Sequence, residues 1–157
     1  HFLENNISKA IQFSQQELVH IIFESVYTKK EIVEKDEREK GERRLLNLGH
    51  TFAHALEKNY HIPHGEAVSI GIMMASKLSY NLGMLKINEL QRIEDLLIST
   101  GLPTSISFQP ELMVEAMKMD KKRQGGSVHF ILLNDIGNAV TREISFSELN
   151  KIFNDLR

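Results

Sequence analysis

The sequence has 157 residues, with no cysteine, no tryptophan and only three prolines. The absence of cysteine excludes disulfide bridges and agrees with a reducing compartment, so we expect a cytoplasmic protein. The longest run of apolar and small residues, at 67–76, is about half of the ~20 residues that a membrane-spanning helix needs. Residues 1–10 lack the basic segment and apolar run of a secretory signal. We therefore expect neither a membrane span nor secretion.

The sequence also lacks a large excess of charge of either sign, because it has 19 basic and 21 acidic side chains and a net charge of −2. A nucleic-acid-binding surface requires a clustered basic excess, so no nucleic-acid partner is expected. The apolar content is 41%, and a chain of this length buries roughly two thirds of its surface on folding. Residues 1–157 are therefore expected to form a single globular domain.

The nine glycines are few, and the apolar residues recur mainly at intervals of three and four. This pattern predicts a mainly α, multi-helical bundle. The helix at 64–83 is apolar nearly all round, so it should be the buried central helix. Two segments near the C-terminus, separated by residues 134–138 with Asp135 and Gly137, predict one small β-hairpin with a longer loop. Helices are expected at 14–37, 43–60, 64–83, 88–100, 111–119 and from Ser145 or Ser147 to Leu156, and strands at 128–133 and 139–144.

The most informative segment carries Arg43, Asn47, His50 and His54 at intervals of four, three and four residues. On one continuous helix these side chains would lie within roughly 60° of one another. Solvent-facing helix surfaces are usually filled by glutamate and lysine, whereas this one offers a guanidinium, an amide and two imidazoles. The spacing favours a functional face, although a plain solvent face is the alternative.

Two histidines at i and i+4 can share a metal ion, as in zinc peptidases. Those enzymes carry a glutamate directly after the first histidine, but Thr51 follows His50, so the peptidase pattern is absent. His64 is a further candidate ligand at the start of the buried helix. A helix N-terminus disfavours the protonated imidazole, and a metal ligand must be unprotonated. A capping role for His64 is equally compatible with this position.

Cationic side chains accompany the histidines. Lys29 lies near the continuation of an apolar stripe on the helix expected at 14–37. The alternative to a functional role is that this lysine only extends its ammonium group to water. Lys121 belongs to a charged segment at 120–126 that is either a solvated turn or an anion site. Together with Arg43, these groups suggest a metal site beside an anionic substrate that carries a phosphate or a carboxylate.

Five segments, in this order, resemble the 3-dehydroquinate synthase family over essentially the whole chain. The Leu-Asn-Leu-Gly-His core followed by His-Gly-Glu is the most specific part of the resemblance. The segments are Asp36-Glu37-Arg38-Glu39, residues 43–57, residues 64–68 from His-Gly-Glu, Gly101-Leu102-Pro103 and Asp120-Lys121-Lys122. The resemblance covers only the family's C-terminal helical domain. It implies that the N-terminal Rossmann-like domain, which holds most of the NAD site, would precede His1.

The resemblance implies an activity. Members of the family convert 3-deoxy-D-arabino-heptulosonate 7-phosphate to 3-dehydroquinate and phosphate in the shikimate pathway of aromatic amino acid biosynthesis. They use NAD catalytically together with a divalent metal, zinc or cobalt. We accordingly expect a phosphorylated sugar acid as substrate, a homodimer, and no activity from this chain alone.

The resemblance also implies roles for individual residues. His50 and His64 correspond to metal ligands, and His54 to a catalytic residue that handles protons and binds substrate. Lys29, Arg43 and Asn47 correspond to residues that act in catalysis and hold the substrate, and Lys121 to a further substrate-binding residue. Lys121 is preferred over Lys122 only by its position in the motif.

Two departures and three alternatives accompany this interpretation. The family's third metal ligand is a glutamate in a segment that would lie upstream of this chain, and Ala53 stands where the family usually has glycine. Related sugar phosphate cyclases such as 2-deoxy-scyllo-inosose synthase share the histidine motif. Iron-dependent alcohol dehydrogenases share the architecture but need a different pattern of aspartate and histidine. The alternative of another class is a non-catalytic helical binding module.

Overall fold

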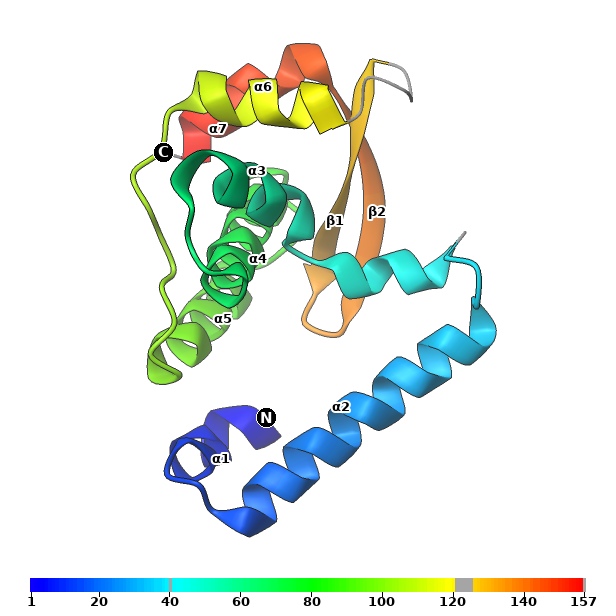
Figure 1. The fold of residues 1–157 in the computed structure, drawn as a ribbon, viewed down its shortest axis with the longest axis vertical. Helices are drawn as coiled ribbons and strands as arrows, with labels where there is room; N and C mark the ends of the chain where they lie inside the picture. The colour runs from blue at the N-terminus through cyan, green and yellow to red at the C-terminus, as the bar shows by residue number, and fades with distance from the viewer. Residues whose placement is uncertain (40, 121–125, 157) are drawn as a thin grey trace.

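The computed structural model describes residues 1–39, 41–120 and 126–156, and these form helices with one β-hairpin (Figure 1). The hairpin pairs two antiparallel strands near the C-terminus. The expected fold class, a multi-helical domain with a small C-terminal hairpin, is therefore confirmed. In chain order the elements are α1 (Phe2–Ile11), α2 (Gln15–Lys35), the 3₁₀ helix η1 (Glu42–Asn47), α3 (His50–Tyr60), α4 (His64–Asn81), α5 (Ile87–Ser99), α6 (Pro110–Asp120), β1 (Ser127–Asp135), β2 (Asn138–Ser145) and α7 (Phe146–Leu156).

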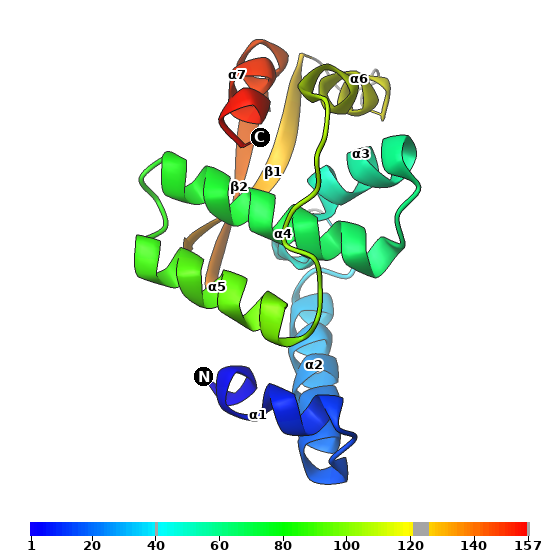
Figure 2. The same ribbon diagram turned by 90° about the vertical axis from the view of Figure 1, so that its left-hand side faces the viewer.

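Helix α4 is the buried centre of the molecule. It packs against α3, α5 and β1, and Figure 2 shows it crossing in front of the hairpin, with α5 alongside. Because α4 has apolar or small residues on every side, no face is reserved for solvent. Five of its apolar side chains are at most 3% exposed: Ala67, Ile70, Met73, Ala75 and Leu78. The expectation of a buried central helix is confirmed.

Buried serines connect α4 to its surroundings. The Ser69 hydroxyl donates a hydrogen bond to the Pro103 carbonyl oxygen at 2.8 Å. The Ser79 hydroxyl donates to its own helix and accepts a hydrogen bond from the Leu133 amide of β1 at 2.9 Å. Since buried polar groups are costly unless they are bonded, these contacts fix α4 against the hairpin and against the segment that follows α5.

Aromatic packing joins the hairpin to the helices at the C-terminal end of the molecule. The Phe52 ring of α3 lies 4.9 Å from the Phe130 ring of β1 and 5.8 Å from the Phe153 ring of α7, centroid to centroid. All three side chains are at most 1% exposed. The strands are longer than expected, because main-chain pairing continues past the apolar residues as far as Asp135 and Asn138.

The structure overturns the expected continuous helix at 43–60. The chain forms η1 first, and α3 begins only at His50, after Gly49 adopts the left-handed conformation with φ of 81°. The cause lies on another helix, because the Gly49 backbone lies directly against Gly71 of α4. A Cβ atom on Gly71 would lie 2.2 Å from the Gly49 carbonyl oxygen. Only hydrogen atoms fit at this crossing, and the backbone turns there.

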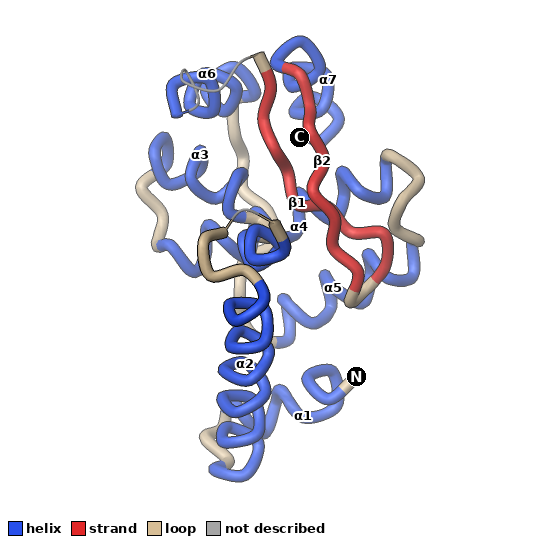
Figure 3. Tube along the Cα trace, turned by 90° about the vertical axis from the view of Figure 1, so that its right-hand side faces the viewer, coloured by secondary structure: helices blue, strands red, loops and turns tan. Residues whose placement is uncertain are grey.

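Helices α1 and α2 lie at one end of the molecule, and Figure 3 shows α2, with α1 beside it, extending away from the remaining helices. Helix α1 was not among the expected elements. The Arg92 guanidinium of α5 donates two hydrogen bonds, at 2.7 and 3.0 Å, to the Glu4 carboxylate of α1 and so connects α1 to α5. Helix α2 has no buried residue, and its Ile22 and Val26 are 60% and 62% exposed. Within the described ranges, no helix is both long and apolar enough to cross a membrane.

Candidate functional site

Three histidines meet where α3 begins beside α4. His50 is the first residue of α3, His54 lies one turn further on, and His64 is the first residue of α4. The ring centroid of His50 lies 6.0 Å from that of His54 and 5.7 Å from that of His64. The close crossing of α3 and α4 at Gly49 thus brings together three imidazoles that belong to two helices.

Two of these imidazoles are held through the same ring nitrogen. His50 Nδ1 lies 3.2 Å from the Leu48 carbonyl oxygen, and His64 Nδ1 lies 2.9 Å from Glu57 Oε1. A carbonyl oxygen and an ionised carboxylate can only accept, so each Nδ1 carries the hydrogen and donates. The Nε2 atom of each unprotonated ring then keeps its lone pair, which is the usual arrangement of a metal-bound histidine.

This donor set fits part of a metal site. Catalytic zinc is generally held by three protein ligands and a water molecule. Across 1–39, 41–120 and 126–156, no group of three or more histidine, aspartate or glutamate side chains is placed to hold one ion. His50 and His64 therefore suit two ligand positions, and a third ligand would have to come from outside the described residues.

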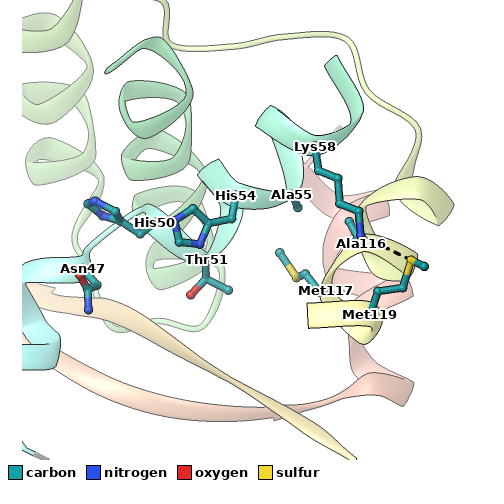
Figure 4. Close-up of a pocket in the computed structure, with 9 residues that line it drawn as sticks. All are labelled: Asn47, His50, Thr51, His54, Ala55, Lys58, Ala116, Met117 and Met119. Atoms are coloured by element: carbon teal, nitrogen blue, oxygen red, sulfur yellow. Dashed lines mark hydrogen bonds between the residues drawn. The ribbon is translucent and has the colours of Figure 1, made fainter. Parts of the chain in front are cut away.

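A cavity of about 500 Å³ lies beside the histidines, between α3 and α6 (Figure 4). Asn47 reaches it from η1, and its side-chain amide donates a hydrogen bond to Glu39 Oε1 at 2.8 Å. One side of the cavity carries two imidazoles and an amide, and the other is lined by methionine and alanine together with Lys58. The lining residues are Asn47, His50, Thr51, His54, Ala55, Lys58, Ala116, Met117 and Met119.

Arg43 does not share a helix with the histidines, contrary to the expected single stripe. Its guanidinium Nη1 donates to the Glu37 carbonyl oxygen at 2.7 Å, and its backbone amide donates to Asp36 Oδ2 at 3.1 Å. Neither Arg43 nor Lys29, which is exposed on α2, is among the described residues that line the cavity. Lys121 lies outside the described residues. The roles of these three cations stay predictions.

Two polar residues that line the cavity were not predicted from the sequence. Thr51 lines it and donates its hydroxyl to the His129 carbonyl oxygen of β1 at 3.2 Å. Lys58 places a cation in the cavity, 3.4 Å from the Met119 sulfur. A sequence signal for Lys58 existed, because it continues the spacing of four residues from His50 and His54 along the same face of α3.

Comparisons with known proteins point to one group of enzymes. Residues 1–123 match a family model described as 3-dehydroquinate synthase C-terminal. The chain is 37% identical over 158 residues to the 3-dehydroquinate synthase of Dictyoglomus turgidum, covering 98% of this chain and 44% of that protein. It is 43% identical over 143 residues to that of Halorhodospira halophila, covering 88% and 40%. The chain thus spans less than half the length of these relatives.

Solved structures with a similar fold are sugar phosphate cyclases. A 2-epi-5-epi-valiolone synthase from Streptomyces hygroscopicus subsp. jinggangensis, with NAD+ and Zn2+ bound, superposes with a TM-score of 0.83 at 26% identity. The match covers 99% of this chain and 45% of that one. A 2-deoxy-scyllo-inosose synthase, complexed with carbaglucose-6-phosphate, NAD+ and Co2+, gives a TM-score of 0.62 at 22% identity, covering 73% and 35%.

Proposed function

Since this chain belongs to the 3-dehydroquinate synthase C-terminal family, we propose that it is the helical metal- and substrate-binding domain of a 3-dehydroquinate synthase. The complete enzyme would convert 3-deoxy-D-arabino-heptulosonate 7-phosphate to 3-dehydroquinate and phosphate. The observation that carries this proposal is the meeting of His50, His54 and His64 beside a cavity, with the Nδ1 atoms of His50 and His64 already bonded to oxygen acceptors.

We assign a divalent metal, zinc or cobalt, and NAD to the complete enzyme. His50 and His64 would hold the metal, which, when bound, polarises the substrate hydroxyl that is oxidised. The NAD+ and Zn2+ in the valiolone synthase structure support this assignment. NAD is assigned to an N-terminal Rossmann-like domain, and no residue of this chain is assigned to it. A homodimer and a cytoplasmic location stay predictions.

The chain's own side chains would bind and orient an anionic substrate. His54 is exposed at the cavity and makes no hydrogen bond with the described residues, so its ring nitrogens are available to hold or move a proton of the substrate. The Asn47 amide, fixed by Glu39, would orient a substrate hydroxyl or carboxylate. Lys29, Arg43 and Lys121 would supply positive charge for the carboxylate and the phosphate.

Metal analysis combined with kinetics of phosphate release tests these roles in the complete enzyme. We expect His50→Ala to abolish bound metal, because one of three ligands is removed. His54→Ala should retain the metal and lower turnover by about 10²- to 10⁴-fold, as loss of a positioned acid-base group does. Arg43→Ala should mainly raise KM through the lost contact with an anionic group. Loss of metal from His54→Ala with retention in His50→Ala would contradict the assignment.

The 157-residue chain alone provides a second test. Incubated with the heptulosonate phosphate, NAD and zinc, it should release no phosphate, because the nicotinamide site and one metal ligand are assigned to a preceding domain. Robust turnover by this chain would contradict the division of the site between two domains.

A second candidate is a sugar phosphate cyclase of different specificity, which is favoured by the 0.83 TM-score of the valiolone synthase. Identity is 37% and 43% to the two 3-dehydroquinate synthases but 26% to that cyclase, so we place 3-dehydroquinate synthase first. Offering the complete enzyme heptulosonate 7-phosphate and, in parallel, sugar phosphates that lack the carboxylate decides between them. Preference for a sugar phosphate without the carboxylate would contradict the first assignment.

A further inference from the structure

We propose that Glu57 is a positioning residue that holds the His64 imidazole in the tautomer and orientation needed to bind a metal ion. The proposal rests on the proposed function for the presence of that metal. It concerns a side chain that is not among the described residues lining the cavity and that has none of the roles assigned above. Glu57 lies in the last turns of α3, and its carboxylate reaches over the connection between the two helices to the first residue of α4.

The contact is specific in geometry. Glu57 Oε1 lies 2.9 Å from His64 Nδ1, and the two side chains are 29% and 60% exposed, respectively. The Nδ1 and Nε2 atoms of an imidazole point away from each other, so a carboxylate bonded to Nδ1 lies away from the metal-binding side of the ring. Glu57 therefore acts on His64 and is not itself the missing third ligand.

The two metal-ligand candidates are held in different ways. His50 Nδ1 is bonded to a main-chain carbonyl, which no side-chain substitution removes. His64 is the more exposed ring, and within the described residues its only hydrogen-bond partner is the Glu57 carboxylate. Without that carboxylate the imidazole can rotate and can carry its hydrogen on Nε2, and either change removes the lone pair from the metal site. Partners of this kind typically change metal affinity by about 10- to 100-fold.

Three variants of the complete enzyme separate this role from its alternatives. Glu57→Ala removes the acceptor, whereas Glu57→Gln removes the charge but keeps an amide oxygen that can accept from Nδ1. Glu66→Ala is the matched control, because Glu66 is exposed two residues after His64 and makes no hydrogen bond or ion pair with the described residues. Each protein is titrated with Co2+ alone by absorbance and with Zn2+ by competition. The tautomer of each histidine is read from ¹⁵N chemical shifts of the metal-free protein.

We expect His64 to carry its hydrogen on Nδ1 in the wild type and in Glu57→Gln, and to shift toward Nε2 in Glu57→Ala. His50 should keep its tautomer in every variant, because its partner is the backbone. Co2+ affinity should fall by about 10- to 100-fold in Glu57→Ala, by less in Glu57→Gln, and remain unchanged in Glu66→Ala.

The proposal is overturned if wild-type His64 carries its hydrogen on Nε2, or if Glu57→Ala and Glu66→Ala have the same affinity. The wild-type tautomer and the Glu57→Gln measurements decide the matter even if Glu57→Ala does not fold. Failure of the wild type to bind Co2+ or Zn2+ would count against the proposed metal site. The tautomer measurement needs no metal, so it tests Glu57 separately from the proposed function.

Discussion

Gly71→Ala should loosen the crossing of α3 and α4. The new Cβ would lie 2.2 Å from the Gly49 carbonyl oxygen, which is roughly 1 Å or more short of ordinary contact. The neighbour is backbone and has no alternative rotamer, so we place the steric cost at the upper end of the overpacking range, about 3 kcal/mol. Alanine regains up to ~1 kcal/mol of helix propensity, leaving a net loss of about 2 kcal/mol. For a domain of this size, that lowers Tm by about 4–8 °C.

Thermal and urea unfolding followed by circular dichroism measure this loss. Gly65→Ala is the matched control, because Gly65 lies in the first turn of the same helix and a Cβ there would meet nothing within 4 Å. We expect Gly65→Ala to be unchanged or more stable by up to ~1 kcal/mol. If Gly71→Ala unfolds at the same temperature and urea concentration as Gly65→Ala, the close crossing is not a constraint and the reasoning is refuted.

Two further predictions concern connections made by single side chains. Ser79→Ala should cost about 1–3 kcal/mol in chemical denaturation, because the buried Leu133 amide loses its hydroxyl partner. Ser76→Ala, which removes only a bond within α4, should cost less, and equal losses would contradict the bridging role. The Arg92 guanidinium lowers the pKa of Glu4 from 4.5 to about 2. Folding therefore disfavours protonation of Glu4, so the stability from this pair is present above pH 4.5 and is lost as the pH falls toward 2. Amide hydrogen exchange in α1, corrected for intrinsic rates, should show this loss in the wild type, and an equal change in Glu4→Gln would contradict it.

The elements that were predicted from the sequence carry their own local signals. Helix α4 is recognisable because it is apolar nearly all round, and the hairpin because two short segments flank the turn residues Asp135 and Gly137. Helix α1 was missed because Ala10 is its only buried residue among those described, and its paired contact to Arg92 lies 88 positions away in the sequence. A pattern read within a short window cannot contain such a partner.

The break at Gly49 was missed for a similar reason. Spacings of three and four continue from Arg43 to His54, so the local pattern favours one helix. What ends η1 there is the close approach of Gly71 on another helix. Of the four residues in the predicted stripe, only His50 and His54 lie on one α-helix, α3, as expected. Asn47 reaches the cavity from a different element.

The spacing of residues in the sequence contains no signal that identifies Glu57 as the partner of His64. The six residues between Glu57 and His64 include the end of one helix and the connection to the next, so helical periodicity does not apply across them. The conformation of the connection between α3 and α4 decides whether the two side chains meet.

Because of the crossing at Gly49 and Gly71, two properties that often vary together in proteins, thermal stability and the geometry of a binding site, can vary separately here. The spacing of the His50 and His64 main-chain atoms depends on where two main chains touch, and neither Gly49 nor Gly71 at that contact has a side chain whose size or rotamer can change. Core residues around it can be exchanged for others of similar volume at modest energetic cost. Such repacking would alter the melting temperature while the main-chain atoms of the two histidines keep their spacing. Heat tolerance and ligand geometry are therefore independently adjustable traits in this domain.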